Sequence, residues 1–190
     1  MVEIAPSMLG ANFGEMKKEA MLVAPHSSYL HMDVMDGHFV PNLTMGPDLV
    51  KALKGIEDID VHLMVSNPTD FIQDFSDVGA DIISVHVEAN NPAKAIKLIK
   101  ELNIKAGIAL NPSTPSSAIE PYIEVTKFLE KEFPNIELNA GHDLNLDNLD
   151  FILKKIPEIK EVSIGHALVC DAIDYGLKET ISKYKQIAQR

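Results

Sequence analysis

The chain has 190 residues, 46% of them hydrophobic and 24% charged, which is an ordinary composition for one globular domain with a single core. Asp and Glu (28) outnumber Lys and Arg (17), so the net charge is −11 and we expect neither nucleic acid nor an anionic membrane as a partner. No apolar run approaches the ~20 residues that cross a bilayer. The single cysteine, Cys170, excludes an internal disulfide framework, and the N-terminus lacks a basic leader, so we expect a cytoplasmic protein.

Short segments with strand character alternate with longer helical patterns along the whole chain. The strand segments are 3–9, 29–36, 59–65, 81–89, 104–111, 136–141 and 161–168. The clearest helical patterns are 92–102, 116–133, 145–156 and 172–189. This alternation, without a linker, predicts one α/β domain over residues 1–190 in which helices cover parallel strands.

Polar side chains recur at or near the carboxyl ends of these strands. They are Ser7, His31, Asp33, His62, His86, Glu88, Asn111, His142 and His166. In a closed barrel such ends form one mouth that carries the catalytic groups, so we predict a TIM-type (β/α) barrel. A complete barrel has eight βα units and this chain shows seven. We therefore expect either pairing of 104–111 with 136–141 or a homodimer that covers the seam.

The strongest constellation of polar residues lies in the second and third strand segments. Alternation along a strand places His31 and Asp33 on one face, and His62 lies at the matching level of the next strand. Two imidazoles and a carboxylate converging at a barrel mouth form a candidate site for a divalent metal. The alternative is that both histidines are core residues satisfied by hydrogen bonds. Because three ligand-type side chains coincide, we favour the metal.

The first part of the chain, about residues 1–118, resembles ribulose-phosphate 3-epimerase. The motifs that carry the resemblance, in order and at family spacing, are APSML (5–9), LHMDVMDGHFVPN (30–42), DVHLM (60–64), HVEA (86–89) and ALNPSTP (109–115). The resemblance implies a phosphorylated sugar substrate and a divalent ion (Zn²⁺, Fe²⁺, Mn²⁺ or Co²⁺) held by His31, Asp33 and His62. It also gives Asp33 an acid/base role, places Ser7 near the substrate, and makes Met35 and Met64 part of an apolar wall around the enediolate.

The resemblance weakens after Pro115. The glycine-rich lid segment of the family is not found there, and Asn139 stands where the family has a carboxylate that is both metal ligand and second acid/base. An amide does not exchange protons at useful pH, so this difference removes half of the two-base chemistry that the family uses.

The remainder, about residues 119–190, resembles the last two βα units of pyridoxine 5′-phosphate synthase. The matching stretches are IELNAGHDLNLDNL (136–149) and 156–181. This resemblance implies an acid/base role for His142 and a site for substrate phosphate, or for a phosphate or sulfate ion, at Gly141, Gly165 and His166. The alternative is that both glycine turns only connect strand to helix. We favour phosphate, because adjacent βα turns late in a barrel are its usual cradle.

Three functional interpretations follow. The first is an engineered chimera, joined within 116–133, that keeps a phosphate site and a metal site but has weak or lost epimerase activity. The second is a working ribulose-phosphate 3-epimerase, an isomerase in which His142 or a water replaces the missing acid. The third, and the one the residues favour least, is a pyridoxine 5′-phosphate synthase.

Overall fold

The computed structural model describes residues 3–109, 127, 131, 138–141 and 144–189. The described strands are all parallel to their neighbours: β1 (Glu3–Pro6), β2 (Leu30–Met35), β3 (Ile59–Met64), β4 (Ile82–His86), β5 (Lys105–Ala109), β6 (Leu138–Gly141) and β7 (Ile159–Ile164). The described α-helices are α1 (Met16–Val23), α2 (Pro47–Leu53), α3 (Ile72–Val78), α4 (Pro92–Glu101), α6 (Leu149–Lys155), α7 (His166–Tyr175) and α8 (Leu177–Ala188).

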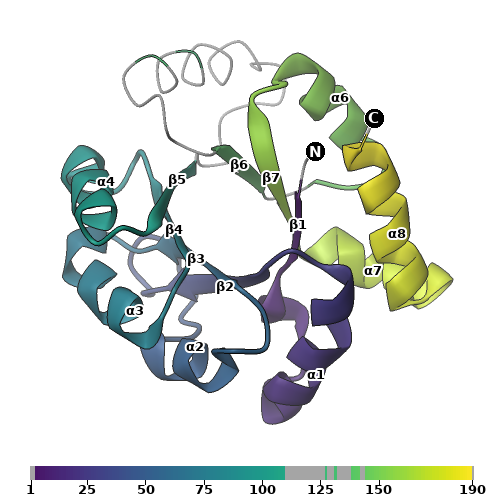
Figure 1. Cartoon of the computed structure of the whole chain (residues 1–190), viewed down its shortest axis with the longest axis horizontal. Coiled ribbons are helices and arrows are strands. Elements are labelled where there is room, and N and C mark those ends of the chain that lie inside the picture. Colours follow the sequence, from purple (N-terminus) through teal and green to yellow (C-terminus); the bar gives the residue numbers. More distant parts are fainter. Residues whose placement is uncertain (1–2, 110–126, 128–130, 132–137, 142–143, 190) are drawn as a thin grey trace.

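The strands form a ring with the helices outside it, which confirms the predicted TIM-type barrel (Figure 1). Two hydrogen-bonded sheets make up the ring, one in the order β2-β3-β4-β5 and one in the order β1-β7-β6. A single bridge between Ser7 and His31 joins β1 to β2. No pairing of β5 with β6 is recorded among the described residues, so closure of the ring by these two strands stays a prediction.

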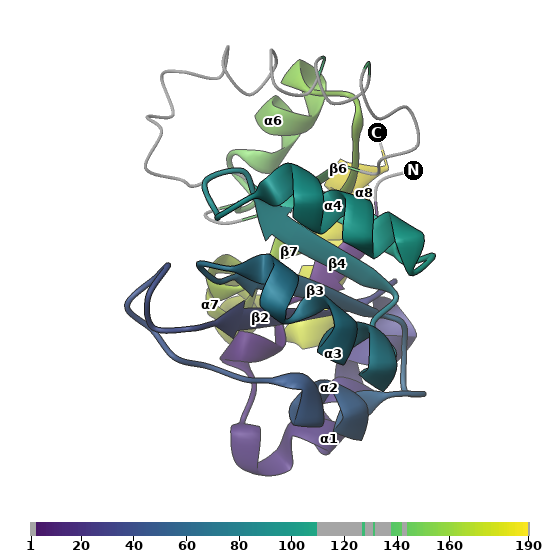
Figure 2. The same ribbon diagram turned by 90° about the vertical axis from the view of Figure 1, so that its left-hand side faces the viewer.

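Side chains along each strand alternate between an outer, apolar face and an inner, more polar face. Both faces are buried, the outer one beneath the helices and the inner one inside the ring. On β2, Leu30, Met32 and Val34 pack outward in the core beneath the helices, whereas His31 and Asp33 belong to the inner face. Viewed from the side, α3 and α4 lie over the outside of β3 and β4, with α2 below α3 (Figure 2). None of the described helices is both long and apolar enough to cross a bilayer.

Several predicted elements differ from the structure in their bounds: β1 ends at Pro6 and β4 at His86, each three residues early, and α6 begins at Leu149, four residues late. Two further differences involve a glycine. Strand β7 ends at Ile164, four residues early, because Gly165 caps a helix that begins at His166. The helix predicted over 172–189 is divided at Gly176, whose φ of 78° lies in the left-handed region that ends helices. The predicted helix over 116–133 falls outside the described residues apart from Lys127 and Lys131, which are both helical.

The contact between β4 and β5 predicts a specific sensitivity to added volume. Gly107 pairs with Ser84, and a Cβ at position 107 would overlap the buried Ser84 hydroxyl. We expect Gly107→Ala to lower the free energy of unfolding by about 1–3 kcal/mol, as overpacked cores do. The control is Gly46→Ala, where an added Cβ meets nothing within 4 Å. Denaturant unfolding of both variants measures the difference, and equal stabilities would contradict the packing described.

Candidate metal centre at the barrel mouth

The register of β2 and β3 brings the three predicted ligands together. Asp33 pairs directly with His62, and His31 lies two residues before Asp33 on the same inner face. One ligand atom from each of the three residues lies within 4.8 Å of the others. The sequence prediction that these side chains converge is therefore confirmed as geometry, while occupation by an ion remains a prediction.

The spacing of the ligand atoms suits a small ion. Asp33 Oδ1 lies 3.3 Å from His31 Nε2 and 3.2 Å from His62 Nδ1. Ligands about 2.0–2.1 Å from a tetrahedral Zn²⁺ are separated from one another by roughly 3.3 Å. The two nitrogens and one oxygen are also donors that Zn²⁺, Fe²⁺, Mn²⁺ and Co²⁺ accept. The residues present therefore fit a divalent metal.

The electrostatics of the cluster couple the imidazoles to Asp33. Burial lowers the pKa of His31, but Asp33 and Asp60 raise it by more, and the net pKa is well above the usual value. Burial raises the pKa of the Asp33 carboxyl, and His31 and His62 lower it by more, so its net pKa is well below the usual range. Asp33 is therefore ionised at neutral pH, the state in which it can bind a metal or accept a proton.

The other residues predicted for the epimerase-like part surround this cluster. The Ser7 hydroxyl donates a hydrogen bond to Asp33 Oδ2, so Ser7 contacts the proposed acid/base directly. Met35 and Met64 pair in register two residues beyond Asp33 and His62, toward the mouth. Both methionines are on the side where a substrate would enter, as an apolar wall requires.

A chain of hydrogen bonds leads from Asp33 toward solvent through two histidines. His62 Nε2 lies 2.8 Å from His86 Nε2, and the two rings are stacked with centroids 4.9 Å apart. His86 Nδ1 in turn lies 3.3 Å from Glu88 Oε2. The sequence showed His86 and Glu88 at a strand end, but only the structure connects them to the metal cluster.

Beneath the mouth lies a second group of polar side chains that sequence reasoning missed. Asp60 Oδ2 is 2.5 Å from His31 Nδ1, and Ser163 Oγ is 2.9 Å from the same nitrogen. His31, Asp60 and Glu161 form a buried set whose ligand atoms all lie within 4.8 Å of one another. The available signal was alternation, because Asp60 lies two residues before His62 and Glu161 two before Ser163 in otherwise apolar strands.

The residues predicted from the second half of the chain are placed only in part. Gly141 ends β6 and pairs with Ser163. Gly165 caps α7, and a Cβ added to it would contact Ser7. His166 is the first residue of α7, but its side chain, like that of Asn139, lies outside what the structure describes. His142 lies wholly outside the described residues. The roles of Gly141, His142, Gly165 and His166 therefore stay predictions.

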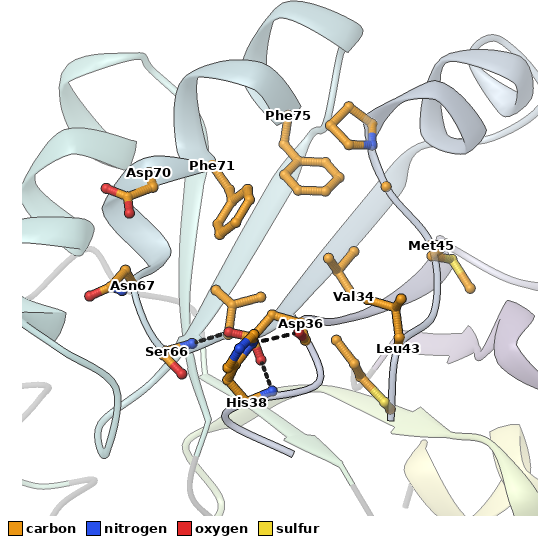
Figure 3. Close-up of a pocket in the computed structure, with 14 residues that line it drawn as sticks. Val34, Asp36, His38, Leu43, Met45, Ser66, Asn67, Asp70, Phe71 and Phe75 are labelled. Carbon is orange, nitrogen blue, oxygen red and sulfur yellow. Dashed lines mark hydrogen bonds between the residues drawn. The ribbon is translucent and has the colours of Figure 1, made fainter. Parts of the chain in front are cut away.

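A separate pocket of about 540 Å³ lies beside the mouth, between the loop after β2 and the start of α3. Phe71, Phe75 and Val34 form its apolar side (Figure 3). Asp36 lies at its edge and accepts hydrogen bonds from the backbone N–H groups of Ser66, His38 and Phe39. Burial raises the pKa of Asp36, but these N–H groups lower it to about 2. Asp36 is therefore ionised at neutral pH, and its hydrogen bonds to the three N–H groups order this loop.

Comparison with known proteins identifies the family. The ribulose-phosphate 3 epimerase family matches residues 3–130. Ribulose-phosphate 3-epimerase of Bacillus subtilis is 40% identical over 168 residues, which cover 85% of this chain and 73% of that enzyme. The chain belongs to the ribulose-phosphate 3-epimerase family. The enzyme of Mycobacterium bovis is 42% identical over 181 residues, which cover 93% of this chain and 76% of that enzyme. The enzyme of Synechocystis is 43% identical over 130 residues, which cover 65% of this chain and 56% of that enzyme.

Solved structures support the fold but not a particular reaction. The chain superposes on KGPDC from Streptococcus mutans with a TM-score of 0.66 and 13% identity, covering 100% of this chain and 98% of that one. It superposes on orotidine 5′-monophosphate decarboxylase from Methanocaldococcus jannaschii, complexed with the inhibitor BMP, with a TM-score of 0.65 and 16% identity, covering 100% of each chain. At such low identity these neighbours establish the barrel architecture alone.

The matches also bear on the predicted join between two families. The alignments with the Bacillus subtilis and Mycobacterium bovis epimerases cover 85% and 93% of the chain, which extends well beyond residue 118. None of these findings shows a segment of pyridoxine 5′-phosphate synthase or a chimera. Of the functional interpretations, the epimerase is therefore the better supported.

The raised pKa of His31 predicts how metal affinity depends on pH. Because the folded pKa lies above the usual value, the imidazole keeps its proton at neutral pH, and an ion must displace that proton. We expect the apparent Zn²⁺ affinity to rise about tenfold per pH unit until the pKa of His31 is passed. Competition with a chromophoric chelator across pH measures this, and an affinity that does not change with pH would contradict the protonated state assigned to His31.

Proposed function

We propose that this chain catalyses epimerisation at C3 of a pentulose phosphate with the help of a divalent metal. The observation that carries the proposal is the convergence of His31, Asp33 and His62 at the mouth, with Ser7 hydrogen-bonded to Asp33. Membership of the epimerase family supports the same reaction. The acidic surface does not oppose an anionic substrate, because helix N-termini and backbone N–H groups bind phosphate without basic side chains.

The chain's own residues divide the chemistry between them. Asp33 is ionised, and it accepts the proton from C3 on one face of the substrate. Ser7 holds Asp33 Oδ2 by a hydrogen bond and so restricts the carboxylate to one orientation. Met35 and Met64 exclude water from the side of the mouth that they line. A bound divalent metal supplies stabilisation of the negative charge that develops on the substrate oxygens.

The opposite face of the substrate needs a second group that returns a proton. Asn139 stands where the family's carboxylate is expected, and we propose that His142 or a water supplies the proton. This replacement makes the reaction slower than in relatives that have two carboxylates, since a positioned acid/base contributes roughly 10²–10⁴-fold. If neither group supplied the proton, activity would be weak or lost, as the chimera interpretation expects. The matches to the epimerase family favour a working enzyme over the chimera.

We further propose that the turns at Gly141–His142 and Gly165–His166 hold the substrate phosphate. Gly165 is the N-cap of α7 and, as a glycine, has no side chain that could accept from the first N–H groups of the helix, which suits a helix start that binds an anion. Action on a small phosphorylated sugar is consistent with a cytoplasmic protein that binds neither nucleic acid nor membrane. A homodimer that covers the β5–β6 seam belongs to the same proposal.

A coupled epimerase assay with ribulose 5-phosphate, run before and after chelation, tests the proposal. We expect measurable turnover that is lost when the metal is removed and returns on addition of Zn²⁺, Mn²⁺, Co²⁺ or Fe²⁺. Equal turnover with and without metal would contradict the role of the cluster. No turnover with any of the four ions would contradict the proposed reaction itself and favour the inactive chimera.

Restoring the family's carboxylate gives an independent test at β6. Asn139 pairs in register with Glu161, which lies in the buried cluster around His31, so the proposal places residue 139 close to the site. We expect Asn139→Asp to raise turnover by roughly 10-fold or more, because it adds a titratable group. Asn103→Asp adds the same charge at the exposed opposite end of the barrel and serves as control. Equal activities of the two variants would show that residue 139 does not face the substrate.

A further inference from the structure

We infer that Asp60 is a positioning residue that fixes the tautomer and orientation of the metal ligand His31. This inference rests on the metal site of the proposed function, but not on turnover. The geometry divides the two ring nitrogens of His31 between different partners. Nδ1 lies 2.5 Å from Asp60 Oδ2 in the barrel interior, whereas Nε2 lies 3.3 Å from Asp33 Oδ1 at the mouth.

The hydrogen bond to Asp60 decides which nitrogen can bind a metal. A neutral imidazole has one N–H group, and an ionised carboxylate can only accept a hydrogen bond. Asp60 therefore holds the proton on Nδ1, so the proton that an ion displaces is the one on Nε2, and the lone pair set free there is directed toward Asp33 and the mouth. The negative charge behind the ring also makes Nε2 a stronger donor to a cation, as in other carboxylate–histidine–metal arrangements.

Burial makes this interaction stronger than a surface contact of the same length. Asp60 has no exposed surface and His31 is 4% exposed, so water cannot replace either partner. The low polarity of such an interior strengthens a charged hydrogen bond. By contrast, His62 is backed by a chain of hydrogen bonds that runs through His86 to Glu88, whose side chain is 38% exposed.

Strand β7 restricts the same ring at the same nitrogen. Ser163 Oγ lies 2.9 Å from His31 Nδ1, and Ser163 itself is buried. The Nδ1–H group thus faces both Asp60 Oδ2 and Ser163 Oγ. A half-turn of the ring would put the carbon Cδ2 in place of Nδ1 and lose both contacts. The contacts from β3 and β7 therefore resist ring rotation, which is what positioning of a ligand requires.

The competing interpretation of this interior group is a second ion held by His31, Asp60 and Glu161. It would require Nδ1 to lose its proton while Nε2 binds the ion at the mouth. The short Nδ1–Asp60 separation suits a hydrogen bond, not an ion between the two groups. Metal stoichiometry separates the two interpretations, with one ion expected per chain.

The test uses Zn²⁺ alone with the full chain. We expect Asp60→Asn to weaken Zn²⁺ binding by about 10–100-fold in competition with a chelator, the usual cost of losing a partner behind a ligand. Asp58→Asn is the matched control, because this exposed carboxylate lies two residues earlier and does not face the ring. It should bind Zn²⁺ as the unmodified protein does.

A second measurement needs no variant and so does not depend on how Asp60→Asn folds. Nitrogen-15 NMR of the Zn²⁺-loaded protein should show His31 protonated at Nδ1 and metal-bound at Nε2. Protonation at Nε2, two ions per chain, or an unchanged Zn²⁺ affinity in a folded Asp60→Asn protein would each overturn the inference. Because these readouts are independent of turnover, an inactive protein that binds Zn²⁺ as described would refute the proposed reaction and leave the role of Asp60 standing.

Discussion

The structure depends on a buried imidazole held between two carboxylates. His31 is almost fully enclosed, with Asp33 on its Nε2 side and Asp60 on its Nδ1 side. An isolated charge in such an interior is strongly unfavourable, so each of the three groups is tolerable only because the others are present. A divalent ion at the mouth would replace the imidazolium proton as the positive charge, which connects the stability of the barrel interior to metal binding.

The contacts that form the site also join the two sheets of the barrel. Ser7 on the β1 side bridges to His31 and hydrogen-bonds to Asp33, while Ser163 of β7 contacts His31 Nδ1. These polar contacts link β1 and β7 with β2, across the junction where backbone pairing is limited to one bridge. The cluster of His31, Asp33 and His62 is therefore built beside the junction of β1 and β2, where two parts of the ring meet.

The sequence predicted the elements and the main cluster because both follow from short-range rules. Alternation in the second and third strand segments placed His31, Asp33 and His62 on one surface, and the structure confirms it. The split at Gly176 was missed because a single glycine is compatible with a helical pattern until its φ is known. Asp60 is the direct register partner of His31 on β3, so its approach follows from the same pairing that joins Asp33 to His62. Ser163 lies 132 positions from His31, and its approach depends on how β7 is placed in the ring. No local pattern encodes that contact.

We propose that two histidines and one aspartate hold a divalent ion at the barrel mouth. X-ray absorption spectroscopy of the Zn²⁺-loaded protein tests it most directly, because the zinc shell is read without reference to turnover. The account predicts one zinc per chain with two imidazole nitrogens and carboxylate or water oxygens at about 2.0–2.2 Å. A zinc shell without imidazole, or with a single histidine, would contradict it.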